Sequence, residues 1–104
     1  MSYNFAQGQE KPMRGKLKEQ DERKIRSNWM LLLEELDGEH VVNQLYQKNI
    51  ITLDDMHQVK AEKTPRKRTE ALLKVVLHAG PGAAFNEFVS ALKEVYPHVA
   101  EKLS

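Results

Sequence analysis

The sequence predicts an all-α protein, a bundle of six antiparallel helices, and three observations lead to this prediction. First, the apolar residues between positions 85 and 96 repeat with the 3.6-residue period of a helix. Second, Gly80-Pro81-Gly82 before this segment and Pro97 after it mark a helix start and a helix end. Third, the other apolar residues fall into further helical segments with short links, which favours antiparallel neighbours.

The first helix is expected to begin at Asp21 and to end at Gly38, a residue suited to a left-handed C-terminal cap. Its apolar residues at helical spacing are Ile25, Trp29, Leu32, Leu33 and Leu36. A second, short helix should end near Asn49, which also tolerates the left-handed conformation. Its apolar face consists of Val41, Val42, Leu45 and Tyr46.

Two threonines mark the starts of the next helices. Thr52 precedes two aspartates and supplies a hydroxyl N-cap for a short helix. The narrow apolar face of that helix is formed by Leu53, Met56 and Val59. Thr64-Pro65 is a stronger signal, because threonine caps a helix and proline loses nothing at the first helical position. The fourth helix then continues to Gly80, with its inward face formed by Leu72, Leu73, Val76 and Leu77.

The last two helices flank Pro97. The stripe of the fifth helix consists of Phe85, Phe88, Val89, Leu92 and Tyr96. A final short helix after Pro97 carries Val99, Ala100 and Leu103. Its position at the end of the chain completes the six helices.

Composition limits the class of protein. A chain of 104 residues is one domain at most, and the absence of cysteine excludes disulfides and thiolate zinc sites. No apolar stretch approaches the ~20 residues that cross a bilayer, and the first residues lack the pattern of a signal peptide. We therefore expect a cytoplasmic protein, with residues 1–20 as a flexible N-terminal tail and residues 21–104 as the folded domain.

Catalysis and metal binding are not expected. The four histidines lie in four different segments, at His40, His57, His78 and His98. Asp54 and His57 share a helix face, but two ligands without helpers bind a metal weakly. Ser27 and Ser90 lie inside amphipathic helices with no oxyanion loop near them. The sequence thus predicts no catalytic residue, no metal site and no cofactor.

Charges at two helix ends oppose the helix dipole. Arg66, Lys67 and Arg68 occupy a first turn, where acids are favoured, and Glu34, Glu35 and Asp37 occupy a last turn, where bases are favoured. A functional interpretation is that oppositely charged patches on a nearly neutral domain support head-to-tail association with similar domains. The alternatives are a solvated face, an internal salt bridge between the clusters, or a role for Asp37 and Glu39 at the start of the second helix.

An ordered set of segments resembles the caspase recruitment domain of the death-domain superfamily, over residues 21–104 and most closely as found in initiator caspases and their adaptors. The first pieces are Leu32 to Leu36, Leu45 to Thr52 and Lys60 to Thr64. The later pieces are Gly80 to Phe85, Phe88, Ala91-Leu92 and Tyr96 to Val99. No single piece is diagnostic, but their order along the chain is fairly specific.

This resemblance implies a six-helix Greek-key bundle, the death fold, with a bent first helix and no catalysis or cofactor. It also implies homotypic pairing of a basic with an acidic surface, and polymerisation into filaments in many members. Carried onto this chain, the basic surface consists of Arg23, Lys24, Arg26, Arg66, Lys67 and Arg68. The acidic surface consists of Glu39, Asp54 and Asp55, with Glu34, Glu35 and Asp37 beside them. Trp29 and Glu70 depart from the pattern, because they stand near places where a strongly basic surface would carry arginine or lysine.

The expected function is a homotypic interaction module that recruits caspase-type effectors, by way of a caspase or an adaptor, in apoptotic or inflammatory signalling. One alternative is a decoy that occupies a partner domain without recruiting an effector. Another is a nucleic-acid binder that uses Lys60 to Arg68 together with the basic tail. Trp29, Phe85 and Phe88 could stack on bases, but all three fall on the predicted core stripes, so nucleic acid is the less favoured partner. No membrane partner is expected.

Overall fold

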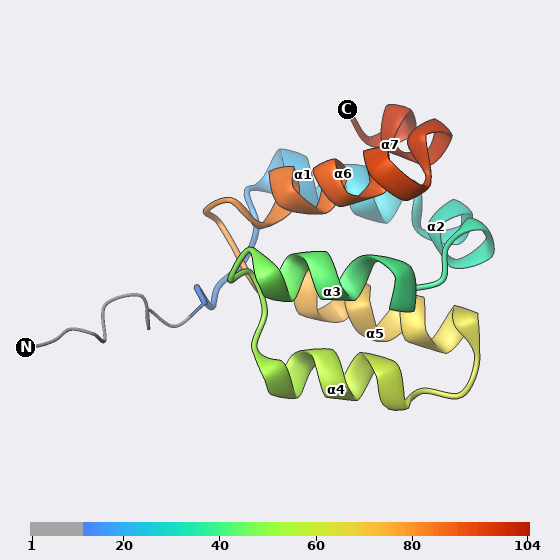
Figure 1. Ribbon diagram of the computed structural model, residues 1–104. Coiled ribbons are helices and arrows are strands. Elements are labelled where there is room, and N and C mark those ends of the chain that lie inside the picture. The colour runs from blue at the N-terminus through green and yellow to red at the C-terminus, as the bar shows by residue number, and fades with distance from the viewer. Residues whose placement is uncertain (1–11) are drawn as a thin grey trace, which may run out of the picture.

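The computed structural model describes residues 12–104. Seven helices are found in this part of the chain, with no β-strand among them (Figure 1). They are α1 (Glu19–Ser27), α2 (Trp29–Glu35), α3 (Glu39–Gln47), α4 (Leu53–Ala61), α5 (Pro65–Leu77), α6 (Ala84–Val95) and α7 (Pro97–Leu103). Between residues 12 and 104, no helix is both long enough and apolar enough to cross a lipid bilayer.

The predicted all-α Greek-key bundle is confirmed. Helix α3 lies at its centre and packs against α4, α5 and α6, while α4 pairs with α5 and α6 with α7. Figure 1 shows α3, α4 and α5 running back and forth between the two ends of the bundle. The end that holds the start of α5 also holds α2, the start of α3 and the C-terminus of α6. Short connections thus make α3, α4 and α5 antiparallel to their neighbours in sequence, as predicted.

The first predicted helix is two helices, because the chain bends at Asn28. The Asn28 backbone N–H donates to the carbonyl of Ile25 at 3.2 Å, and its side-chain amide donates to the carbonyl of Lys24 at 2.8 Å. In a continuous α-helix the Asn28 N–H would donate to the Lys24 carbonyl, four residues back, but here the side-chain amide takes that carbonyl and the N–H bonds three residues back. The helix restarts with Leu32 donating to the Asn28 carbonyl, so the bend implied by the family resemblance is present.

Gly38 does not cap the first helix, and that prediction was wrong. The backbone at Gly38 is right-handed, and Gly38 precedes α3 as its N-cap. Helix α2 ends at Glu35 because Leu36 is extended. The reason for glycine is space, since a Cβ at position 38 would lie 2.6 Å from the carbonyl oxygen of Arg68 on α5. The connection between α2 and α3 can therefore pack directly against the α5 backbone.

The predicted threonine caps are confirmed. The Thr52 hydroxyl accepts from the Asp55 backbone N–H while the Asp55 carboxylate accepts from the Thr52 N–H, which completes a capping box. The Thr64 hydroxyl accepts from the Lys67 N–H, with Pro65 in the first turn of α5. Asn49 has the expected left-handed backbone, at a φ of 62°.

The core is drawn from all seven helices. Phe88 is the largest fully buried side chain, and Phe85 is buried beside it, as predicted. Trp29 is partly buried against this core. Tyr46 and Leu53 differ from the prediction, because each ends on the surface with more than 40 % of its area exposed. Both stand at the edge of a short helix, where a narrow buried face leaves a neighbouring apolar residue in solvent.

The flexible tail predicted over residues 1–20 differs from the structure between residues 12 and 20. Gly15 and the connection after α5 exchange hydrogen bonds, from the Gly15 N–H to the carbonyl of His78 and from the Gly80 N–H to the carbonyl of Gly15, both 2.9 Å. Leu17 is 5 % exposed and belongs to the core. A lone leucine in a polar segment has no helical periodicity to reveal its burial. Residues 1–11, the rest of the predicted tail, lie outside the described residues.

Candidate interaction surfaces

The two misplaced charge clusters meet at an ion pair between Arg68 and Asp37. Arg68 Nε donates to Asp37 Oδ1 at 2.8 Å, and Arg68 Nη2 donates to Asp37 Oδ2 at 3.0 Å. Arg68 also donates from Nη1 to the carbonyl of Glu62 at 3.0 Å. The side chains of Arg68 and Asp37 are only 16 % and 18 % exposed. This two-point contact is the internal salt bridge that was one interpretation of the clusters.

Asp37 is held by several donors. The hydrogen bond from Arg68 is the main cause that lowers the pKa of Asp37 to about 2, against a smaller opposing effect of burial. Asp37 Oδ1 also accepts from the Glu39 N–H at 3.0 Å, so Asp37 serves the start of α3 as well. The same carboxylate raises the pKa of Arg68. Both residues are thus committed to the fold, which removes them from the freely exposed part of the predicted patches.

Tyr96 joins the C-terminus of α6 to this region. Its hydroxyl accepts from the backbone N–H of Asp37 at 3.1 Å and lies 2.9 Å from Nδ1 of His40. The rings of His40 and Tyr96 also stack, with centroids 6.3 Å apart. Tyr96 was predicted only as part of the core stripe. A tyrosine in place of phenylalanine at the end of that stripe is the sequence signal for this polar role.

The predicted acidic surface is divided between two ends of the bundle. Glu34, Glu35 and Glu39 are exposed around the end of α2 and the start of α3. Glu35 lies 3.4 Å from His98. Asp54 and Asp55 begin α4, which runs antiparallel to α3 (Figure 1). A nine-residue helix is about 13 Å long, so the two acidic groups are separated by the length of α3.

Asp55 is not available as an exposed acid. Its carboxylate closes the capping box with Thr52 and lies 3.2 Å from the Arg14 guanidinium, with 12 % of the side chain exposed. Asp54, the next residue back, is exposed. Arg14 falls in the predicted tail, and no local sequence signal pairs it with α4.

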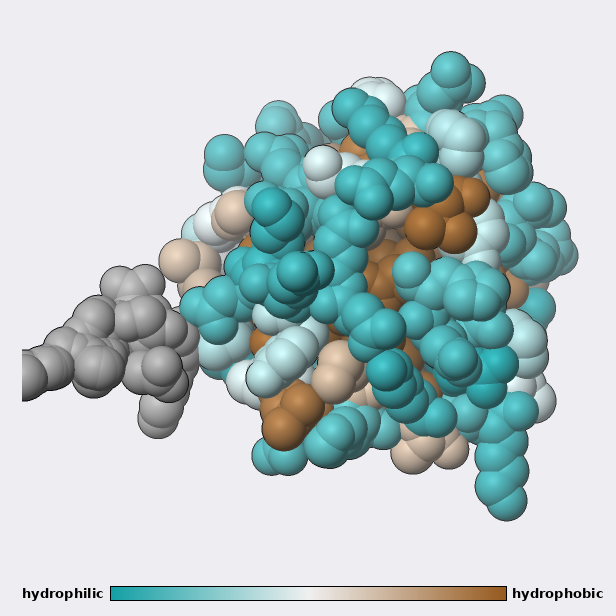
Figure 2. Space-filling model, viewed as in Figure 1, coloured by the Kyte–Doolittle hydropathy of each residue, from teal (hydrophilic) through white to brown (hydrophobic). Residues whose placement is uncertain are grey.

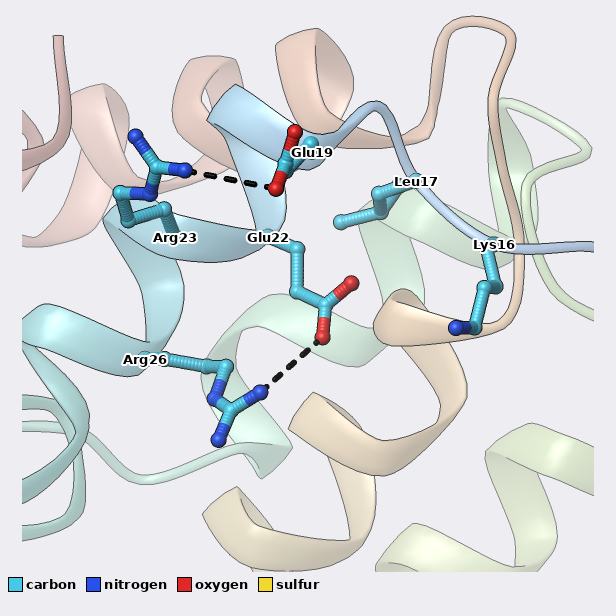
Figure 3. A pocket seen from close by; sticks show the side chains of 6 residues that line it. All are labelled: Lys16, Leu17, Glu19, Glu22, Arg23 and Arg26. Atoms are coloured by element: carbon cyan, nitrogen blue, oxygen red, sulfur yellow. Dashed lines mark hydrogen bonds and ion pairs between the residues drawn. The ribbon is translucent and has the colours of Figure 1, made fainter.

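The cations on α1 are partly compensated on their own helix. Figure 3 shows a shallow pocket along α1 in which each arginine pairs with a glutamate one turn earlier. The Arg23–Glu19 and Arg26–Glu22 distances are 3.4 and 3.5 Å. Lys24 lies elsewhere, with its ammonium 5.7 Å from the centre of the Phe85 ring.

The α1 and α5 cations do not form one continuous patch. Arg26 and Trp29 share a groove with Leu77, at the C-terminal end of α5. Arg66 is eleven residues earlier on that helix, about 16 Å away along its axis. Glu70, between them and partly buried, lines a different groove with Lys67 and Lys74. The basic surface implied by the resemblance is therefore two groups, one on α1 and one at the start of α5.

The group at the start of α5 is the more accessible one. Every residue from Lys60 to Lys67 is exposed, and no longer exposed run occurs between residues 12 and 104. We call residues 60–67 the basic loop, because it carries four cations and one carboxylate. Among the described residues, none forms an ion pair with Arg66 or Lys67. Their charges are thus presented to solvent.

The described residues contain little else that could act chemically. No group of three or more histidine, aspartate or glutamate side chains between residues 12 and 104 could hold a metal ion. Asp54, His57, Ser27 and Ser90 are exposed and share no hydrogen bond with one another. Figure 2 shows a mainly hydrophilic face with separate hydrophobic areas.

One comparison with known protein families bears on these surfaces. Residues 22–104 match the family described as "Caspase recruitment domain". The matched region includes every helix from α2 to α7 and most of α1. It also contains the basic loop and both groups of exposed acidic residues.

Proposed function

The chain belongs to the caspase recruitment domain family, and we propose that it recruits caspase-type effectors by binding their caspase recruitment domains. The family is one of homotypic protein-interaction modules and not of enzymes. Recruitment needs no chemistry in this domain, because two effectors held on one assembly meet at a high effective concentration. We place this activity in the cytoplasm, within apoptotic or inflammatory signalling.

The observation that carries the proposal is the arrangement of free charge along α4. Asp54 is exposed in its first turn, and the basic loop begins in its last turn, at Lys60, and continues into the first turn of α5. One domain can therefore offer cations at one end and a carboxylate at the other, which suits head-to-tail contact with a second domain. We further propose that repetition of this contact gives self-association into filaments.

Charge reversal in the basic loop tests the proposal. The double variant Arg66→Glu with Lys67→Glu changes two exposed side chains and leaves the Arg68–Asp37 pair in place. We expect it to abolish binding to a partner caspase recruitment domain, measured by titration of a labelled partner, while circular dichroism stays unchanged. The matched control is Lys93→Glu with Lys102→Glu, which gives the same change of charge on exposed lysines of α6 and α7. Equal binding by both double variants would remove the basic loop from the mechanism.

A duplex oligonucleotide added to the same titration distinguishes nucleic-acid binding from homotypic binding. Phosphate contacts weaken steeply with salt and occur on any duplex. A homotypic contact requires the partner domain, and added duplex should not displace it. Displacement by duplex of arbitrary sequence would favour nucleic acid as the partner of Arg66 and Lys67.

A further inference from the structure

We propose that Thr64 is a phosphorylation site, and that phosphate on its hydroxyl turns off the basic loop. The proposed modifying enzyme is a proline-directed protein kinase that favours a cation three residues after its target. Thr64 is followed by Pro65 and, at the third position, by Lys67. The regulatory part of this inference rests on the proposed function, and the phosphorylation itself does not.

Access to Thr64 is the first argument. Thr64 lies inside the longest exposed run of the described residues. Its backbone is extended, with φ −125° and ψ 153°, and Glu62 is extended as well. A kinase holds its substrate in an extended form, so only the first turn of α5 needs to open, and helix ends are the parts of a fold that open at least cost.

The charges around Thr64 are the second argument. Lys63 precedes it, and Arg66 and Lys67 follow in a first turn that contains no acid. Cations at this place are disfavoured by the helix dipole, and the structure gives Arg66 and Lys67 no carboxylate as partner among the described residues. A phosphate brings a charge of about −1.5 to −2 next to all three cations. The start of α5 then carries the negative charge that the helix dipole favours, and the cations gain a partner.

The transfer itself is an ordinary phosphoryl transfer from the Mg-ATP of the kinase. Thr64 Oγ1 forms a bond to the γ-phosphorus, the bond from that phosphorus to the bridging oxygen breaks, and ADP leaves. The hydroxyl proton passes to a base of the kinase. The phosphate ester keeps oxygen acceptors near the Lys67 N–H, which Thr64 Oγ1 accepts from at 3.1 Å in the unmodified protein. The N-cap is thus retained.

Regulation follows from the sum of charges. The basic loop has four cations and one carboxylate, a net charge of +3, and the phosphate, at about −1.5 to −2, cancels at least half of it. A partner guided by this charge should associate about tenfold more slowly at low ionic strength, and the difference should fade as salt is added.

The first experiment measures phosphorylation of the whole chain. The full-length protein, its Thr64→Asn variant and a peptide of residues 60–70 are incubated with a cyclin-dependent kinase and Mg-ATP, and incorporation is followed by mass spectrometry. We expect one phosphate on Thr64 in the protein and none on the asparagine variant at this position. An unmodified Thr64 in the folded protein overturns the proposal, whether or not the peptide is phosphorylated.

The second experiment separates charge from capping. Asparagine and aspartate both cap helices, so Thr64→Asn and Thr64→Asp differ in charge alone. The aspartate variant should melt about 2–6 °C higher than the asparagine variant, because its charge favours the helix start. It should also bind the partner more weakly. If the Arg66 and Lys67 reversal leaves binding intact, the basic loop has no part in partner binding and the proposed regulation fails, while the phosphorylation and melting results still decide whether Thr64 is a site.

Discussion

Arg68 binds Asp37 at two points, with Nε–Oδ1 and Nη2–Oδ2 distances of 2.8 and 3.0 Å between residues 31 positions apart. The pair fastens the start of α5 to the connection between α2 and α3. Thr69 strengthens the same junction, since its buried hydroxyl donates to the Leu36 carbonyl at 2.9 Å. Arg68 therefore maintains the fold, while its neighbours Arg66 and Lys67 are exposed and form no ion pair with another described residue.

Replacing Arg68 should reduce stability, and replacing Arg66 should not. Arg68→Ala removes two part-buried hydrogen bonds to the Asp37 carboxylate and one exposed bond to the Glu62 carbonyl, which leaves that carboxylate without its cation. We expect its melting temperature to fall by about 5–10 °C. Arg66→Ala, the exposed control, should stay within about 3 °C of the original chain. Equal melting temperatures for the two variants would contradict the structural role of Arg68.

Low pH should remove the contribution of the Arg68–Asp37 pair to the stability of the fold. The folded-state pKa of Asp37 is about 2, below its ordinary value of 3.8. Its stabilisation is thus fully present above the ordinary value and is lost as pH falls from there towards 2. Thermal unfolding between pH 6 and pH 2 measures this. The difference in melting temperature between the original chain and Asp37→Asn should be constant near pH 6 and shrink below pH 4. A constant difference down to pH 2 would contradict a stabilising role for the ionised Asp37.

Gly38→Ala should destabilise the protein by steric conflict. A Cβ at position 38 would stand 2.6 Å from the backbone carbonyl oxygen of Arg68, and backbone on a packed helix moves little. We expect a loss of about 1–3 kcal/mol in the free energy of unfolding, measured with urea. Gly82→Ala is the matched control, because its Cβ would meet the flexible end of the Met13 side chain at 3.3 Å. That variant should change the free energy by less than about 0.5 kcal/mol.

Leu17→Ala tests whether the segment before α1 belongs to the fold. Leu17 is buried in the core, so its truncation should cost about 2–5 kcal/mol of unfolding free energy. Lys16→Ala, next to it and exposed, should have little effect. A flexible tail over residues 1–20 predicts no change in either variant, and urea unfolding distinguishes the two outcomes.

Local signals in the sequence predicted most of the helices. Thr52 and Thr64 start helices because their hydroxyls bond within one turn, and such short-range chemistry is readable from neighbouring residues. Gly38 was misread because its role depends on α5, about 30 positions later. Leu17 was missed because one apolar residue has no period, and its burial depends on where the chain turns back onto residues 79 and 80.

The candidate surfaces were predicted less completely for the same reason. The sequence does not distinguish between the three adjacent cations Arg66, Lys67 and Arg68. Only the packing of α2 against α5 makes Arg68 the partner of Asp37. Asp54 and Asp55 are likewise adjacent in sequence. The capping box and Arg14 withdraw Asp55 from solvent and leave Asp54 exposed. Tertiary contacts thus decide which member of each charged run remains available.

Because Gly15 and Leu17 pack on the connection after α5, they limit how far the N-terminus of this domain can be truncated. The matched family region begins at residue 22, three residues into α1. A recombinant fragment trimmed to that boundary would lose the first turn of α1 and uncover the backbone of Gly80, on which Leu17 rests. Weak partner binding by such a fragment would report a damaged fold instead of a missing contact, so binding studies should retain the chain from residue 12 onward.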